Sequence, residues 1–259
     1  MNLYASSLLL IFLVGIGTVL VACEIGWQVG VRVKARGGGN IATLEGSLLG
    51  LLALIIGFTF AMALARYEGR RDAVLNEANA IGTTALRARL LPEPHRAEIL
   101  KLLREYAQLR VDYIYISGGK SLAESPTTID RSNKIQEALW LQVKALVAKD
   151  NSTVPTGLFI QTLNEMIDAQ GKRLSTLRNN IPNLVLFLLF GITAVSCAFA
   201  GYASGVDPTR TRLPVTITAL LICGVIFVIL DLDRPNVGFI TISQQPMIDT
   251  LSTINGFSD

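Results

Sequence analysis

Hydrophobic positions gather along the chain in four long blocks, separated by polar or amphipathic sequence. The blocks cover residues 3–23, 46–65, 182–203 and 213–230, and no charged residue lies inside them. Each block is close to the roughly 20 apolar residues that a helix needs to cross a bilayer. The pattern therefore predicts an all-α integral membrane protein with four transmembrane helices.

The long stretch between the second and third blocks has the periodicity of amphipathic helices. Its first helix continues directly from the second block as far as "PEP" at residues 92–94, and three more follow, with apolar residues three and four apart. We expect a helical extramembrane bundle that continues the second and third membrane helices. The predicted division is 1–65 (membrane helices 1 and 2), 66–181 (helical domain), 182–231 (membrane helices 3 and 4) and 232–259 (C-terminal tail).

Composition agrees with the membrane class. Hydrophobic residues make up 51% of the chain and charged residues 17%, and the mean hydropathy is +0.46. A signal peptide is the alternative for the first block, but "MNLYASS" has no Lys or Arg before a long apolar run, so we expect a retained helix. Cys23, Cys197 and Cys223 lack the spacing of a zinc site or a disulfide framework.

The charges of the loops leave the sidedness open. The two loops that join the paired membrane blocks carry Arg32, Lys34, Arg36, Arg210 and Arg212, which by the positive-inside rule places these loops in the cytoplasm and the helical domain outside. Arg66, Arg70 and Arg71 argue for the opposite arrangement.

Motifs of enzymatic chemistry fail on inspection. "SGGKS" resembles the end of a phosphate-binding loop, but Ile114 stands where that motif needs glycine. His95, the only histidine, follows "PEP" with no nucleophile or carboxylate arrangement, and we expect it to be solvated. We predict no enzyme, cofactor or metal site and no nucleic-acid partner.

The second membrane helix offers a stronger pattern. At about 100° per residue, the residues within about 40° of Phe58 form one stripe that changes from bulky and apolar to small and then polar. The members of this stripe are Leu51, Leu54, Phe58, Met62, Ala65, Gly69, Asp72 and Asn76. Such a stripe lines a pore if several copies surround an axis, with an apolar constriction followed by a vestibule. The alternative is an amphipathic helix whose polar stripe faces water. The opposite face, with Ile56, Phe60, Tyr67, Val74, Ala78 and Ile81, predicts a packing surface.

Charged residues flank the stripe and follow the fourth block. Arg66 and Arg70 share one flank with Glu77, and Glu68 and Arg71 are placed to pair locally. Asp231, Asp233 and Arg234 stand at the membrane edge, where we expect an ion pair with arginines of the second helix rather than an ion site. We predict that these residues are structural ion pairs or vestibule walls.

Several stretches carry a family resemblance. "SLLGLLALIIGFTFAMALARYEGRRDAVLNEANAIGTTALRARLLPEPHRAEILKLLREY", "LNEMIDAQGKRL" and "DLDRPNVGFITISQQP" resemble the bacterial bestrophin-like family of unknown function over nearly the whole chain. "SLLG", the apolar run and "GF" are similar to the pore helix of true bestrophins. The second aromatic of the bestrophin cluster is missing around "RYEGRR", and no acidic calcium clasp is recognisable.

The resemblance implies a homopentamer of subunits with four membrane helices and a cytoplasmic helical domain, and it puts Phe58 at the neck. Our leading hypothesis is an oligomeric ion channel of a bacterial inner membrane, whose partners are the lipid bilayer and further copies of itself. The rival is a non-conducting membrane interaction, assembly or signalling subunit that docks another membrane complex through its helical domain.

Overall fold

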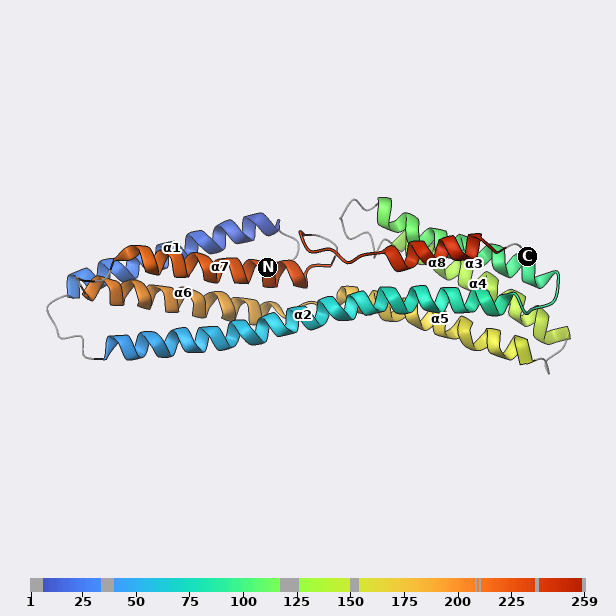
Figure 1. Cartoon of the computed structure of the whole chain (residues 1–259), viewed down its shortest axis with the longest axis horizontal. Helices are drawn as coiled ribbons and strands as arrows, with labels where there is room; N and C mark the ends of the chain where they lie inside the picture. Colours follow the sequence, from blue (N-terminus) through green and yellow to red (C-terminus); the bar gives the residue numbers. More distant parts are fainter. Residues whose placement is uncertain are drawn as a thin grey trace. The chain divides into compact units, whose positions relative to one another are not determined.

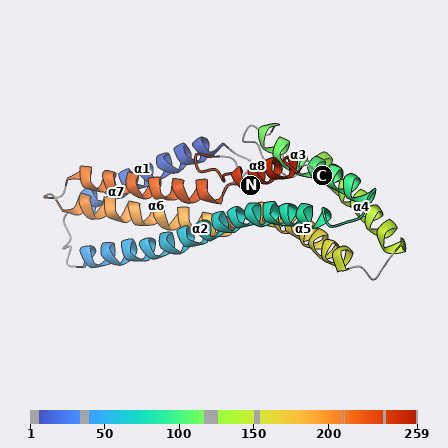
Figure 2. The same ribbon diagram turned by 45° about the vertical axis from the view of Figure 1, so that its right-hand side comes forward.

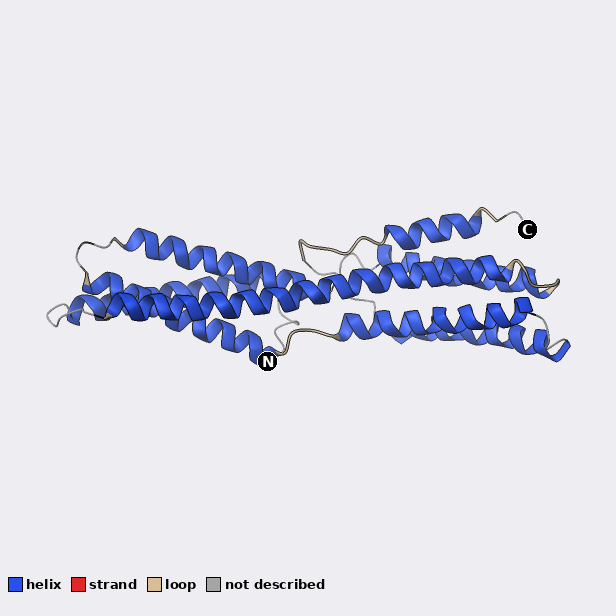
Figure 3. Cartoon of the chain, turned by 60° about the horizontal axis from the view of Figure 1, so that its bottom comes forward, coloured by secondary structure: helices blue, strands red, loops and turns tan. Residues whose placement is uncertain are grey.

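The computed structural model describes residues 7–33, 40–116, 126–149, 154–207, 209, 211–235 and 238–257. These residues form helices and connecting loops, with no strand among them (Figure 3). The helices are α1 Leu8–Val33, α2 Ile41–Ala88, α3 His95–Ile116, α4 Pro126–Lys149, α5 Val154–Arg178, α6 Asn183–Val206, α7 Arg212–Asp233 and α8 Gln245–Asn255 (Figure 1). The all-α prediction is confirmed.

The chain divides into two compact units. Residues 1–66 and 180–234 form one, here called the membrane unit, and residues 67–179 and 235–259 form the other, here called the helical unit. Helix α2 contributes to both. Among the described residues, four helices are long and apolar enough to cross a membrane. They include the predicted blocks except for the start of the first, since residues 3–6 lie outside the described residues. Helices α5 and α6 are separate, because Pro182 lacks the N–H that a continuous helix would need there.

In the membrane unit, α1, α6 and α7 run side by side (Figures 1 and 2). Glycines allow α1 and α6 to approach closely: a Cβ added at Gly26 would lie 1.8 Å from the carbonyl oxygen of Ala198, and one at Gly201 would lie 2.2 Å from that of Cys23. Small residues at a helix crossing suit a lipid environment, where association depends on packing rather than on burial from water. Cys23, Cys197 and Cys223 are free and buried here.

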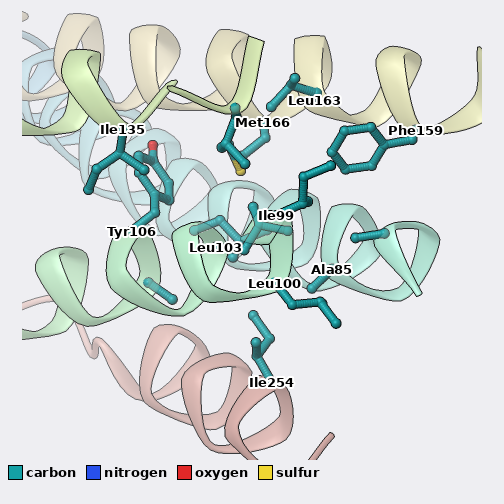
Figure 4. Packing of buried hydrophobic residues seen from close by; sticks show 14 of the residues in the cluster. Ala85, Ile99, Leu100, Leu103, Tyr106, Ile135, Phe159, Leu163, Met166 and Ile254 are labelled. Carbon is teal, nitrogen blue, oxygen red and sulfur yellow. The ribbon is translucent and has the colours of Figure 1, made fainter. Parts of the chain in front are cut away.

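The helical unit has a conventional hydrophobic core (Figure 4). The predicted periodic positions Ile99, Leu103 and Tyr106 of α3 point into it, as do residues of α2, α4 and α5. The core also includes Met247, Leu251 and Ile254 of α8. Helix α8, in the predicted C-terminal tail 232–259, belongs to the helical unit, and its apolar positions fall on one helical face.

Hydrogen bonds fasten α8 to its neighbours. Arg104 of α3 donates from Nε to the carbonyl of Ile254 at 3.3 Å and from Nη2 to that of Phe257 at 3.2 Å. Thr250 donates to the carbonyl of Ala78 in α2 at 3.3 Å. The carbonyls at the end of a helix have no partners within it, and a guanidinium satisfies them.

A polar layer crosses the core of the helical unit, centred on Glu77 of α2. Its carboxylate is fully buried between Arg110 of α3, with Nε 2.8 Å from Oε1, and Arg173 of α5, whose Nη1 donates to Oε2 at 2.6 Å. Arg173 also donates to Oε1 of Gln244 at 3.0 Å. One carboxylate thereby joins α2, α3 and α5, and through Arg173 the segment before α8.

The same layer sets the protonation of its members. Burial alone raises the pKa of the Glu77 carboxyl, but the charges and hydrogen bonds of Arg110 and Arg173 outweigh it and hold the pKa below the ordinary value. Beside Glu77 and its two arginines, the Tyr106 hydroxyl donates to Oε1 of Gln170 at 2.9 Å, and Gln136 donates to the same oxygen. Burial and the Glu77 charge raise the pKa of Tyr106, which stays a neutral donor.

We predict that Gly201→Ala destabilises the membrane unit by about 1–3 kcal/mol, because the new methyl group forces α1 and α6 apart. The matched control is Gly191→Ala on the same helix, where an added Cβ meets nothing within 4 Å. Thermal unfolding in detergent, followed by circular dichroism, should show a lower Tm for Gly201→Ala only. Equal Tm values for the two variants would contradict the close α1–α6 crossing.

We also predict that Glu77→Gln destabilises the helical unit by about 3–5 kcal/mol at neutral pH, because it leaves two buried guanidiniums without their counter-charge. The stability due to Glu77 is present above its ordinary pKa of 4.5 and is lost as the pH falls through its lower folded-state pKa, so the variant should lose part of the acid dependence. Urea unfolding read from Trp140, which packs on this core, in a Trp27→Phe background measures both effects. Exposed Glu105→Gln on α3 is the control; an effect of similar size there would refute the prediction.

Candidate functional site

The predicted stripe lies on the uncovered side of α2. In the membrane unit, Leu51, Leu54 and Phe58 are 47%, 56% and 64% exposed, and Met62 and Ala65 are also exposed. In the helical unit, Asp72 and Asn76 are exposed and Gly69 is half-buried. Within one subunit, therefore, no other helix of the described part of the chain covers these exposed side chains.

The buried side of α2 in the membrane unit is turned from the predicted packing face. Leu52, Thr59 and Ala63 are buried, whereas Phe60 is exposed and Ile56 is half-buried. The hydroxyl of Thr59 donates to the carbonyl of Ile55 at 2.7 Å, so this residue buries without an unsatisfied polar atom. The sequence pattern predicted that the large residues Ile56 and Phe60 pack against the subunit. Instead, the buried side of α2 carries Ala63, which is small, and Thr59, whose hydroxyl bonds its own helix.

In the helical unit the prediction of the packing face fits better. Val74, Ala78 and Ile81 are buried as expected, and Tyr67 is half-buried. Two charged residues, Arg70 and Glu77, are also buried on this side of α2. Periodicity of apolar residues alone does not reveal such positions, since their partners come from helices far away in sequence.

Arg70 is turned towards the end of α5. Only 2% of this residue is exposed, and its Nε and Nη2 donate to the carbonyls of Thr176 and Asn179 at 3.3 and 3.0 Å. A guanidinium at the C-terminal end of a helix also meets the negative end of the helix dipole. The charge of Arg70 is therefore engaged within the subunit.

Arg66 and Asp233 lie together at the edge of the membrane unit. Nε of Arg66 is 4.0 Å from Oδ1 of Asp233, and Oδ2 of the same carboxylate accepts the backbone N–H of Ile181 at 2.8 Å. Asp231, Asp233 and Arg234 are all buried. One carboxylate thus connects the end of α7 with α2 and with Ile181, two residues before α6 begins.

Glu68 and Arg71 remain at the surface. Both are exposed, and the structure shows no ion pair between them in the part of the chain that it describes. The sequence did not predict that Glu77 contacts Arg110 and Arg173, or that Arg173 contacts Gln244. Nothing in the spacing of these residues along the chain marks them as neighbours.

His95 differs from the sequence expectation. It is buried rather than solvated, with Nδ1 2.8 Å from Oε1 of Gln142 and Nε2 3.4 Å from Nζ of Lys149. These contacts join the start of α3 to α4. A histidine in the first turn of a helix looks exposed in sequence, but α4 covers it here.

Comparison with known proteins gives a consistent result. The family model for the Bestrophin-like domain matches residues 41–247, from the start of α2 into α8. No curated protein matches the sequence.

Solved structures of a bacterial bestrophin homologue from Klebsiella pneumoniae share the fold. A structure of this homologue with one mutation matches with a TM-score of 0.67 at 15% identity, covering 97% of this chain and 100% of the other. A structure with another mutation gives a TM-score of 0.69 at 16% identity with the same coverage, and a further structure gives 0.65 at 18% identity, covering 96% of both chains. With its four membrane-length helices and a family match over most of its length, the chain is a multi-pass membrane protein that belongs to the Bestrophin-like domain family.

Proposed function

We propose that this protein is an ion channel of the bacterial inner membrane, built as a homo-oligomer, with five subunits as the favoured number, in which α2 lines the pore. The observation that carries the proposal is the exposed stripe of α2, from Leu51 to Asn76. Membership of the Bestrophin-like domain family supports it, and so does the fold shared with a bacterial bestrophin homologue.

The two edges of the stripe support a ring of α2 helices. One edge, with Leu52, Thr59 and Ala63, is buried against the helix's own subunit. The other edge lies about 100° away from Phe58 in the opposite direction and includes Gly50 and Gly57. A Cβ added at either glycine meets nothing within 4 Å. A helix with one edge on its own subunit and an open edge that carries glycines suits close contact with a neighbouring copy.

The exposed residues between these edges then face the axis of the ring. Leu51, Leu54, Phe58 and Met62 form an apolar constriction, and such a constriction gates ions by dewetting. Asp72 and Asn76 line a wider polar vestibule beyond it. The family resemblance favours the cytoplasm as the side of the membrane on which the helical unit lies.

The structural ion pairs hold this arrangement in place. Arg66 is near Asp233, Arg70 binds the end of α5, and Glu77 binds Arg110 and Arg173. Each contact fixes the rotation of α2 about its own axis, and that rotation decides which residues face the pore.

We predict a complex of five subunits, five times 28.0 kDa, in native mass spectrometry or light scattering in detergent. Gly57→Leu should reduce this mass to that of single subunits, because the new side chain occupies the contact edge while leaving the subunit itself unstrained. Gly17→Leu on α1, where an added Cβ also meets nothing within 4 Å, should keep the complex intact. A wild-type monomer or dimer would exclude a ring of α2 helices and favour the non-conducting interaction subunit.

We predict that Phe58→Ala raises ion flux through reconstituted vesicles several-fold, because removing the phenyl group widens and wets the constriction. Phe60→Ala is the matched control: the same truncation on the same helix, off the stripe. Flux assayed with an ion-sensitive dye inside the vesicles compares the two variants with wild type. Equal flux for wild type and Phe58→Ala in a conducting preparation would rule out Phe58 as a neck residue.

A further inference from the structure

A cavity of about 300 Å³ lies between three helices of the membrane unit, where α1 and α6 approach their C-terminal ends and α7 begins. These three helices lie side by side in Figure 1. Glu24 and Trp27 of α1 and Arg212 of α7 supply polar and aromatic groups to its wall, and Leu20 and Val215 supply apolar ones. The cavity is separate from the stripe of α2 that we propose as the pore lining.

The charged residues of this cavity stand where two apolar blocks end. Glu24 directly follows the first block, residues 3–23, and Arg212 directly precedes the fourth, residues 213–230. Tryptophan is enriched at the same boundary of membrane proteins, and Trp27 is half-buried here. Glu24, Trp27 and Arg212 therefore lie at the depth of the lipid headgroups.

The apolar wall of the cavity lies deeper. Leu20 is one turn before Glu24 and Val215 is one turn after Arg212, and both lie inside the apolar blocks. Beside them, Val21 is 58% exposed and Ile217 is 49% exposed. The cavity thus presents charged groups at headgroup depth and apolar side chains at the depth of the acyl chains.

The guanidinium of Arg212 is held in place with donors to spare. Its Cζ lies 3.2 Å from the centroid of the Trp27 ring, and its Nη1 lies 3.5 Å from Oε2 of Glu24. A close charge-assisted hydrogen bond measures about 2.7–2.9 Å, so guanidinium and carboxylate face each other without binding tightly. The side chains of Arg212 and Glu24 are 55% and 48% exposed. Within the described residues, Nε and Nη2 of Arg212 make no hydrogen bond.

We propose that this cavity binds the headgroup of a phospholipid that carries both a phosphodiester and a primary ammonium group, which is the chemistry of phosphatidylethanolamine. The phosphate oxygens accept hydrogen bonds from Arg212, whose planar fork matches them and whose stacking on Trp27 fixes its direction. The ammonium group donates to the carboxylate of Glu24. The acyl chains follow Leu20 and Val215 into the hydrocarbon.

Other common phospholipid headgroups match these two charges less well. A phosphatidylglycerol headgroup offers a phosphate to Arg212 but no cation to Glu24, and its negative charge is repelled by that carboxylate. A phosphatidylcholine headgroup has a cation without N–H donors, so it forms no hydrogen bond with Glu24. The binding site needs only a membrane location, and it is independent of whether α2 lines a pore.

The test measures which lipid lies against Trp27. Full-length Trp140→Phe protein keeps Trp27 as its single tryptophan and is reconstituted into vesicles of phosphatidylethanolamine and phosphatidylglycerol in equal amounts. One of the two lipids at a time carries brominated acyl chains, which quench the fluorescence of a tryptophan that they contact. From the two degrees of quenching we expect phosphatidylethanolamine to be favoured at Trp27 by about three- to fivefold.

Four variants in this background assign the preference to the cavity. Arg212→Gln should remove it, and Glu24→Gln should reverse it in favour of phosphatidylglycerol, because the positive charge of Arg212 is then not offset. Thr216→Phe keeps both charges but fills the cavity, which Thr216 lines, and should also remove the preference. Arg32→Gln, an exposed cation on α1 outside the cavity wall, is the matched control and should leave it unchanged.

Three results would overturn the proposal. They are equal quenching by the two lipids in the wild-type cavity, a Glu24→Gln preference that equals that of the wild type, and a Thr216→Phe preference that does. Soluble phosphoethanolamine at millimolar concentration should not displace the lipid; if it does, the site takes a free phosphate ester and the assignment to a lipid is wrong. Because Glu24 and Arg212 are exposed, their variants should keep the wild-type Tm, which is measured first. Loss or absence of ion flux tests the channel only and leaves these quenching results unaffected.

Discussion

Helix α2 passes from a lipid environment into an aqueous one without a break, and the rest of the fold depends on how its surface suits both. Residues 46–65 of this helix carry no charge, as a lipid environment requires, and the residues after them carry charges that lipid would not accept. A single helix from Ile41 to Ala88 nevertheless runs through both. Each unit therefore has to supply its own contacts to the same helix, and these contacts determine which of its sides stays open.

The contacts differ in kind between the two units. In the membrane unit, burial from water gives no driving force, and close packing holds the helices together. Glycines let α1 and α6 approach, and Thr59 and Ala63 lie with Leu52 on the buried edge of α2. In the helical unit an ordinary apolar core suffices, and a buried carboxylate with two arginines crosses it. Removing one member of such a layer leaves an uncompensated charge, so it fixes the register of the helices strongly.

The arginines after the second apolar block show how charge is divided around α2. A purely interfacial function would leave them exposed at the lipid surface. Here Arg70 is buried on backbone carbonyls and Arg66 approaches Asp233, whereas Arg71 stays exposed together with Glu68 and Asp72. The same short stretch thus holds the helix against its own subunit on one side and leaves charged residues exposed on the other.

The sequence by itself determined the membrane blocks, the helical periodicity of the stretch between them and the stripe centred on Phe58. These are local features, since hydropathy and a period of 3.6 residues depend only on neighbours along one helix. The tertiary structure alone decided that Glu77 pairs with Arg110 and Arg173, that α8 joins the helical core, that His95 is covered by α4, and that Thr59 and Ala63 rather than Phe60 form the buried edge of α2. Each of these depends on residues far apart in the chain, and no periodicity along one helix records which distant side chain will stand opposite.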